Sequence, residues 1–316
     1  MSLMAYFIRR TLAMIPLTIG VSMLIFFMFA ITPIDPVNIK VGLDPHAQKN
    51  RDQYVRAWGL DKPIYQRYLD WAIPMFTRLE FGESWTRDVP VEEIFAPFIG
   101  NTIFLFGIAF VLSLLVSTII GIVAATHHNS WFDQSALFGS LVGFSIPNFV
   151  LGIVLIMTLY ASFGILAVYL PGNDKNLTDQ IPALVTAEIT MLISGIAFAT
   201  RLVRSQMLNV LRQNYIRTAR AKGLSERSVI YKHALRNALL PFVTVIALSL
   251  PGVLSGSAII ERVFNYPGVG RQLIRAALEF DLPTVLAVNM FFSVLTIFML
   301  LVADVVYGLV DPRIKF

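Results

Sequence analysis

Ionisable side chains inside long apolar stretches are the residues of this sequence best placed to do chemistry. Glu188 interrupts the otherwise uncharged run over residues 181–200. A carboxylate at the centre of a bilayer costs about 2.5 kcal/mol or more, so Glu188 should face other helices or water. Two roles stay open for it: lining a pathway for a solute, or making a hydrogen bond between two helices.

The motifs of common catalytic sites are missing. The sequence contains no cysteine, which excludes disulfides, thiol chemistry and cysteine-ligated metals. It has no H-E-x-x-H, no G-x-S-x-G and no G-x-x-x-x-G-K-[ST] phosphate loop. His127 and His128 adjoin each other, and we expect them to be solvated in a short turn with no acid beside them. The chain is therefore expected to be no enzyme and to bind no metal or cofactor itself.

Long uncharged segments predict an all-α integral membrane protein. Hydrophobic residues make up 56% of the chain and charged residues 14%, whereas soluble domains carry about 25% charged residues. A transmembrane helix needs about 20 mostly apolar residues. The apolar runs show no alternation with a period of two, so we expect about six helices and no barrel strands. The runs cover residues 11–31, 94–126, 134–173, 181–200, 237–260 and 282–303.

The distribution of Lys and Arg predicts that both termini face the cytoplasm, because basic loops stay on that side. Thirteen basic residues fall on one side of the expected membrane and four fall in the short loops on the other side. The basic side comprises residues 1–10, 127–134, 201–236 and 304–316. Arg201 and Arg204 end an apolar run, and we expect both to snorkel to the inner interface.

The same pattern divides the chain into four parts. We expect an N-terminal transmembrane helix (1–31), an extracytoplasmic cap segment (32–96), a transmembrane domain of five helices (97–308) and a cytoplasmic tail (309–316). A basic cytoplasmic loop over residues 201–236 interrupts the five-helix domain.

Prolines within two of the apolar runs predict bent helices. Proline lacks an N–H and its ring clashes with the preceding turn, so Pro147 and Pro251 should bend their helices, and such bends often shape a cavity. Pro147 and the adjacent Asn148 are therefore candidates for lining a pathway.

Within the loop 201–236, the sequence predicts a short helix, a sharp turn and a second helix. Residues 215–222 suit the first helix, and Gly223 suits a left-handed conformation after its end. Ser225 suits the N-cap of the second helix, with Glu226 in its first turn. We expect small Ala219 and Ala221 to let the surface of another protein approach closely. The candidate docking residues are Thr218, Ala219, Arg220, Ala221, Lys222 and Gly223.

This loop resembles the cytoplasmic coupling loop of binding-protein-dependent, type I ATP-binding-cassette importer permeases. The oligopeptide/dipeptide/nickel permease subfamily reads close to Y-x-R-T-A-R-A-K-G-L, as in residues 215–224, and then A-L-R-N-A-L-x-P, as in residues 234–241. Arg217, Thr218 and Arg236 stand where other importers of this type carry glutamate, alanine and proline. Further similar elements follow in the expected order at residues 59–63, 81–84, 145–149, 261–264, 267–271 and 311–313.

The resemblance implies a type I importer permease bundle that forms half of a translocation pathway for di- or oligopeptides. Such a chain lies in a prokaryotic inner or plasma membrane and pairs with a homologous second permease. Two cytoplasmic ATP-binding subunits, which carry ATP and Mg²⁺, would contact the coupling loop, and an extracytoplasmic substrate-binding protein would deliver the cargo. The bilayer is the remaining partner, and no nucleic acid is expected.

The identity of the cargo stays open, because the same subfamily includes permeases for nickel chelates, glutathione and some sugars. A second class of function is a secondary transporter that works alone. It would need several ionisable relays near the midplane and usually repeat symmetry, and Glu188 alone is a poor relay.

Overall fold

The structure is a computed structural model that describes residues 3–33, 35–42, 50–170, 177–239, 242, 246 and 257–310. Within these ranges the secondary structure is helical and no strand is present, apart from one isolated bridge between Glu83 and Pro90. This confirms the all-α prediction.

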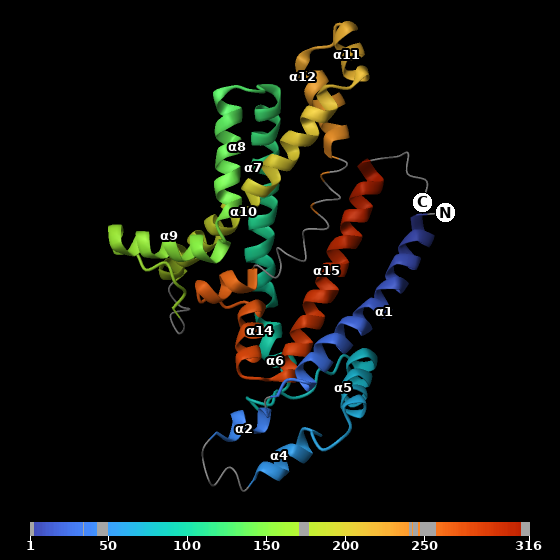
Figure 1. Cartoon of the computed structure of the whole chain (residues 1–316), viewed down its shortest axis with the longest axis vertical. Coiled ribbons are helices and arrows are strands. Elements are labelled where there is room, and N and C mark those ends of the chain that lie inside the picture. The colour runs from blue at the N-terminus through green and yellow to red at the C-terminus, as the bar shows by residue number, and fades with distance from the viewer. Residues whose placement is uncertain are drawn as a thin grey trace. The chain divides into compact units, whose positions relative to one another are not determined.

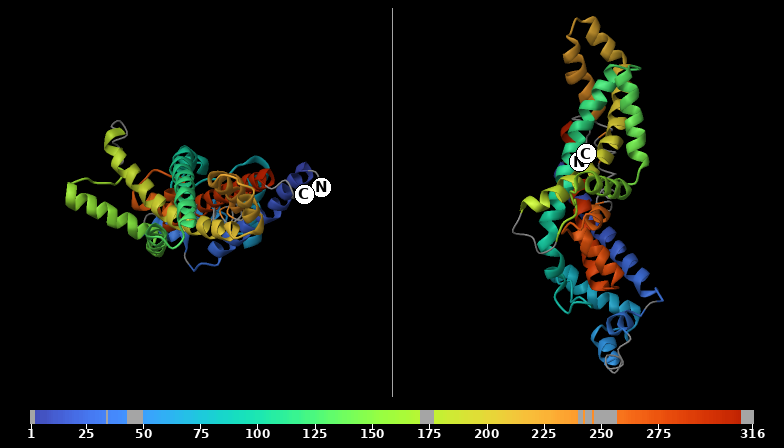
Figure 2. Two further views of the ribbon diagram at one scale, coloured as in Figure 1. Left: turned by 90° about the horizontal axis from the view of Figure 1, so that it is seen from above. Right: turned by 90° about the vertical axis from the view of Figure 1, so that its left-hand side faces the viewer.

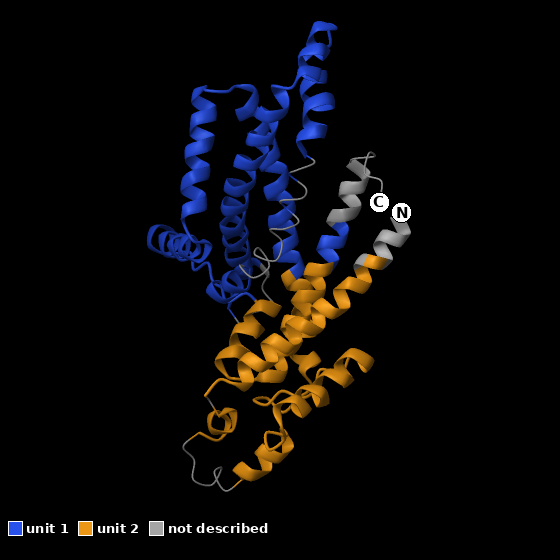
Figure 3. Cartoon of the chain, turned by 45° about the vertical axis from the view of Figure 1, so that its right-hand side comes forward, with its two compact units in different colours: residues 1, 103–266, 298–316 blue, residues 2–102, 267–297 orange. Residues whose placement is uncertain are grey.

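The chain divides into two compact units (Figure 3). Unit 1 comprises residues 1, 103–266 and 298–316, and unit 2 comprises residues 2–102 and 267–297. The helices α7 (Ile99–Thr126) and α15 (Leu282–Val310) each contribute residues to both units.

Four helical segments within the described ranges are long and apolar enough to cross a membrane: Thr11–Ala30, Val91–Thr126, Thr178–Leu211 and Leu282–Val302. A strongly bent pair of helices supplies up to one more span. The run over 237–260, which includes Pro251, lies largely outside the described residues. The sixth span and the cytoplasmic position of both termini therefore stay predictions.

In unit 1, the bent pair consists of α8 (Trp131–Ser145) and α9 (Asn148–Phe163), which both pack against α10 (Leu177–Leu211) (Figure 1). Ser130 is the N-cap of α8, and its side chain accepts a hydrogen bond of 3.2 Å from the Asp133 N–H. The helix ends at Ile146, whose extended backbone precedes Pro147. The two helices meet at 96°, a bend that Figure 2 shows from two further sides. This confirms the predicted bend at Pro147.

Glycines let the helices of unit 1 approach one another closely, as is usual between membrane helices. A β-carbon at Gly121 of α7 would lie 2.7 Å from Val203 Cβ of α10, and one at Gly195 of α10 would lie 2.7 Å from Ser113 Cβ of α7. A β-carbon at Gly143 of α8 would lie 2.9 Å from Ala197 Cβ. These contacts are tighter than carbon atoms tolerate, so the helix spacing depends on glycine at these positions.

We expect Gly121→Ala to destabilise the chain by about 1–3 kcal/mol, the usual cost of overpacking a well-packed core. The added methyl group also meets the backbone N of Arg204 at 3.1 Å, and this atom has little freedom to move. The control is Gly107→Ala on the same helix, because a β-carbon there meets no atom of the described residues within 4 Å. Thermal unfolding of the purified chain in detergent measures both variants. Equal midpoints for the two variants would contradict the proposed close contact.

Unit 2 packs the long helix α1 (Leu3–Ala30) with short helices of the segment that follows it. These are α2 (Pro36–Val41), α4 (Arg51–Ala57), α5 (Ile64–Arg78), α6 (Val91–Phe95) and the 3-10 turn η1 (Ala96–Phe98). Phe26 of α1 forms a buried cluster with Tyr68 and Ala72 of α5 and with Leu282 and Leu286 of α15. The Tyr68 hydroxyl also forms a buried hydrogen bond of 2.9 Å with Ser22 Oγ, so α5 is held against α1.

The buried carboxylate of Asp281 holds the loop between α5 and α6 in unit 2. It accepts hydrogen bonds from Ser84 Oγ, from the Trp85 N–H at 3.0 Å and from Thr284 Oγ1 at 2.8 Å. Asp281 lies in the connection between α14 (Val269–Leu278) and α15. Its hydrogen bonds therefore fix the loop around Trp85 to the connection between these two helices.

Candidate functional site

The predicted turn in the basic loop is present. The helix α11 (Asn214–Ala221) ends at Lys222, and Gly223 follows with φ +77°, a conformation that favours glycine. Ser225 then caps α12 (Glu226–Ser228), which continues into the π-helical turn η2 (Val229–Ala234) and a helical stretch to residue 239. We call residues 214–239 the 214–239 hairpin. The sequence predictions for the first helix, Gly223 and Ser225 are confirmed.

One face of this hairpin is part of the core of unit 1. Ile216 and Ala219 of α11 lie three residues apart, on one face of the helix. They join a buried cluster that extends to the ends of α7 and α10. The buried members of the cluster are Ile122, Ala125, Ala199, Val203, Met207, Ile216, Ala219, Val229, Ala234, Ala238 and Phe242. The hairpin is therefore packed onto two long helices.

The expectation that Ala219 faces another protein is wrong, because Ala219 is only 7% exposed and is packed within its own chain. The other five candidate docking residues are exposed: Thr218, Arg220, Ala221, Lys222 and Gly223. The small side chain of Ala219 serves the close packing of the hairpin.

The exposed face of the hairpin is basic. Arg220 forms an ion pair of 2.6 Å with Glu226 across the turn. This hydrogen-bonded contact lowers the pKa of Glu226 and raises the pKa of Arg220, so both stay charged near neutral pH. The pair contributes above the unfolded-state pKa of the carboxyl and is lost when acid protonates Glu226. Arg217 and Lys222 are also exposed, which leaves a net positive surface.

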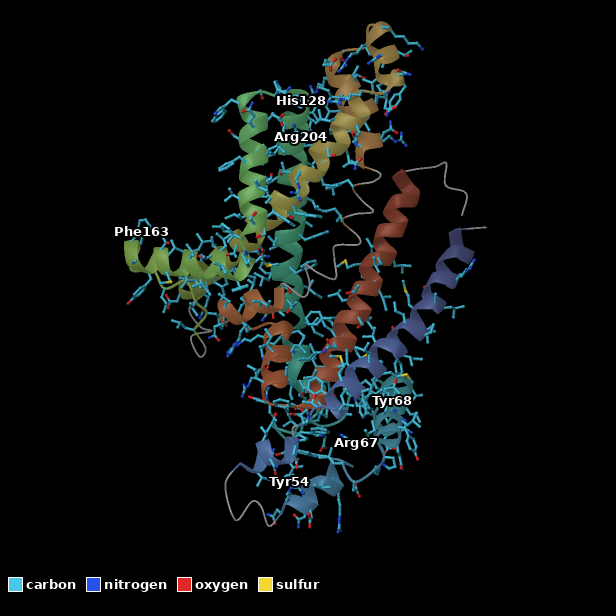
Figure 4. The ribbon with its side chains drawn as sticks, in the orientation of Figure 1. Tyr54, Arg67, Tyr68, His128, Phe163 and Arg204 are labelled. Carbon is cyan, nitrogen blue, oxygen red and sulfur yellow. The ribbon has the colours of Figure 1, made fainter. Side chains whose placement is uncertain are left out.

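A buried ion pair joins α10 to the first turn of α8. The Asp133 carboxylate is 1% exposed and accepts hydrogen bonds from Arg204 Nε and, at 2.7 Å, from Arg204 Nη2. The Asn129 N–H donates to the same carboxylate at 2.9 Å, and His128 Nδ1 lies 3.2 Å from it. Figure 4 shows His128 and Arg204 at the same end of the helices.

Two sequence expectations are corrected at this cluster. Arg204 does not snorkel alone, since it is held by Asp133, and His128 does have an acid beside it. Sequence reasoning missed Asp133 as a residue of interest. The pattern Ser130-x-x-Asp133 resembles a capping box, and this signal could have placed Asp133 in the first turn of a helix beside His128.

A cavity of about 330 Å³ lies among the long helices of unit 1. Pro147 and Asn148 line it at the break between α8 and α9, together with residues of α7 and α10. Its polar lining includes Ser113, Ser194 and Ser257, and Ser194 Oγ is buried without a hydrogen-bond partner among the described residues. The two candidate pathway residues at the bend thus share one cavity.

Glu188 lies elsewhere and is not among the residues that line this cavity. Both of its carboxylate oxygens are buried, and neither has a hydrogen-bond partner within the described part of the chain. Burial, together with the nearby carboxylates of Glu261 and Glu188, raises the pKa of Tyr266 to about 12, so this phenol stays protonated. The structure thus gives no support to an interhelical hydrogen bond at Glu188, and its role in a pathway stays a prediction.

Within the described ranges, no group of three or more His, Asp or Glu side chains is arranged to hold a metal ion.

Two protein-family profiles match the chain. The "Binding-protein-dependent transport system inner membrane component" profile matches residues 117–316, and the corresponding N-terminal profile matches residues 3–102. The oligopeptide transport system permease protein AppB of Bacillus subtilis is 37% identical over 99% of each chain. The dipeptide transport system permease protein DppB of Escherichia coli is 33% identical, again over 99% of each chain. The di/tripeptide transport system permease protein DppB of Pseudomonas aeruginosa is also 33% identical.

A solved structure shows a similar fold. The crystal structure of an amino acid ABC transporter with histidines matches 68% of this chain and 93% of its own with a TM-score of 0.53. The sequences are 15% identical, so this similarity concerns the fold alone.

Proposed function

The chain belongs to the family of binding-protein-dependent transport system inner membrane components, and from that premise we propose how it works as a subunit of an importer. It is a multi-pass membrane permease for di- or oligopeptides. In this proposal, the 214–239 hairpin receives movement from an ATP-hydrolysing partner and transmits it to α7 and α10.

The observation that carries the proposal is the continuous buried cluster beneath the hairpin. Ile216 and Ala219 of the hairpin share one core with Ile122 of α7 and with Val203 and Met207 of α10. Close-packed side chains transmit displacement because interiors have few voids and low compressibility. A displacement of the hairpin by a partner on its exposed basic face therefore displaces α7 and α10 as well, because no loop lies between them to deform.

The assembly that we propose contains partners with distinct tasks. A homologous second permease completes the pathway, two cytoplasmic subunits bind ATP and Mg²⁺, and an extracytoplasmic binding protein delivers the peptide. The absence of a G-x-x-x-x-G-K-[ST] motif from this sequence supports placing ATP hydrolysis outside the chain. The chain itself is then a non-catalytic subunit.

The cavity at the break between α8 and α9 is the part of the pathway that we assign to this chain. Its volume of about 330 Å³ falls in the range of small-molecule sites. Pro147 and Asn148 line it, and the helices that border it include the two that carry the hairpin. Movement of α7 and α10 would change its dimensions, which is how hydrolysis and passage of the peptide are coupled in this proposal.

We expect Ala221→Trp to weaken binding of the ATPase subunits by about tenfold or more, because an exposed bulky side chain holds a partner surface away. Ala221 is exposed, so the fold of the chain should be kept. Ala219→Trp should instead unfold the hairpin, because Ala219 is buried. The measurements are co-purification of the subunits and the thermal midpoint of the chain.

The control is Ala161→Trp, at an exposed alanine of α9 outside the hairpin, which should bind the ATPase subunits normally. Normal co-purification of Ala221→Trp would refute the docking role of the hairpin.

A further inference from the structure

A second cavity, of about 490 Å³, lies within unit 2, between the cap helices and the adjoining ends of α1 and α15. Three of the four tryptophans of the chain line it: Trp58, Trp71 and Trp85. The rings of Trp58 and Trp85 are stacked, with centroids 4.8 Å apart and planes at 9°. Tyr54 extends this aromatic wall, since its ring lies 5.6 Å from Trp58. The cavity is large enough for a small ligand and offers broad apolar faces.

Two hydrogen-bond donors of this cavity lack an acceptor among the described residues. Arg67 of α5 is half-buried, and within the described part of the chain its guanidinium has no carboxylate partner. Burial lowers its pKa, and its guanidinium lies 5.9 Å from the centroid of the Phe26 ring. Trp71 Nε1 is buried and likewise lacks a partner among the described residues. A buried N–H costs free energy unless an acceptor meets it, and a half-buried cation also gains from a nearby acceptor. A carboxylate would be an acceptor for both.

Of the acidic residues that line the cavity, Glu83 is the one that forms no ion pair with the described residues. Lys62 pairs with Asp70 at 2.6 Å, and Asp88 pairs with Lys40 at 2.7 Å. The exposed carboxylate of Glu83 forms no ion pair with any described residue. Arg56 also lines the cavity and adds an exposed positive charge. The cavity thus combines unpaired positive charge, one unpaired negative charge and aromatic walls.

We propose that this cavity binds a small zwitterionic peptide with an apolar or aromatic side chain (Arg67 and Tyr54 are labelled in Figure 4). The peptide carboxylate meets Arg67 and the Trp71 N–H, the ammonium group faces Glu83, and the side chain lies against Trp58 and Trp85. The inference rests on the proposed function and adds to it a peptide site on this chain, separate from the cavity between α8 and α9.

Tryptophan fluorescence gives a direct test, because the remaining tryptophan, Trp131, lies in α8 of unit 1 and is 81% exposed. In the full-length Trp131→Phe chain in detergent micelles, all of the indole emission comes from the residues of this cavity. The probe is alanyl-phenylalanine, compared with its C-terminal amide and its N-acetyl derivative. We expect a saturable fluorescence change with the free dipeptide and about tenfold weaker binding of either derivative.

Paired variants assign the two ends of the peptide. Arg67→Gln should weaken binding of the free dipeptide about tenfold, so that the dipeptide no longer binds more tightly than its amide. Glu83→Gln should make the free dipeptide bind no more tightly than its N-acetyl derivative. The controls are Arg78→Gln and Glu80→Gln, two exposed positions nearby that do not line the cavity. Both controls should bind the dipeptide like the parent chain.

Three outcomes overturn the site: no saturable signal, equal binding of the dipeptide and its amide, or a signal from phosphatidylglycerol alone. The last would mean that the cavity holds a lipid phosphate. Peptide import by the assembled transporter is measured separately. Normal import without binding at the cavity refutes this site but not the permease function, whereas a complex that never imports peptide refutes the permease function itself.

Discussion

Asp133→Asn should lower the free energy of unfolding by about 3–5 kcal/mol, the usual cost of removing one partner from a buried ion pair. The Arg204 side chain is 14% exposed, so its charge would stay in a poorly hydrated place without its carboxylate. The Asn129 N–H and His128 would also lose their charged acceptor. Denaturant titration of the chain in mixed micelles measures the change.

The matched control for Asp133 is Glu226→Gln, which breaks the exposed ion pair with Arg220 in the same unit. This variant should have little effect, because solvent screens exposed pairs. The double variant Asp133→Leu/Arg204→Met should recover much of the lost stability, since apolar residues often replace a buried pair without penalty. Equal stability of Asp133→Asn and Glu226→Gln would show that the buried ion pair contributes no more to stability than the exposed one.

Gly223→Val should abolish most of the peptide-stimulated ATP hydrolysis by the assembled transporter. The φ of Gly223 is +77°, and the left-handed region costs a residue with a β-carbon roughly 1–2 kcal/mol. A β-carbon at Gly223 meets no atom within 4 Å in the described part of the chain, so the penalty comes from the backbone and not from a clash. The equilibrium between the turned hairpin and other conformations would shift about tenfold against the turn, and stimulated hydrolysis should fall by up to about tenfold.

Gly223→Asn is the matched control, because asparagine adopts the left-handed region more readily than other residues with a β-carbon. It should keep most of the stimulation. ATPase rates are measured in reconstituted vesicles with and without loaded binding protein. If valine and asparagine gave the same rates as glycine, the geometry of this turn would have no part in coupling.

The sequence by itself determined the helical character of the chain and the position of its main turn. The apolar runs that form α1, α7, α10 and α15 predict helices because backbone groups in a bilayer must be paired within the segment. The turn at Gly223 could also be predicted from the sequence, because it depends on the local preference of glycine for positive φ and on a serine cap.

Tertiary structure decided which side chains meet. Asp133 and Arg204 are 71 residues apart in the chain, and they pair because α8 packs on α10. Ala219 is buried because the hairpin folds back onto α7 and α10, although its small size agreed equally well with an exposed contact. The cavity that contains Arg67 and three tryptophans is likewise lined by residues from α1, from helices of the cap segment and from α15. Local preferences and composition set where helices begin and end, but the pairing of distant residues depends on how those helices pack.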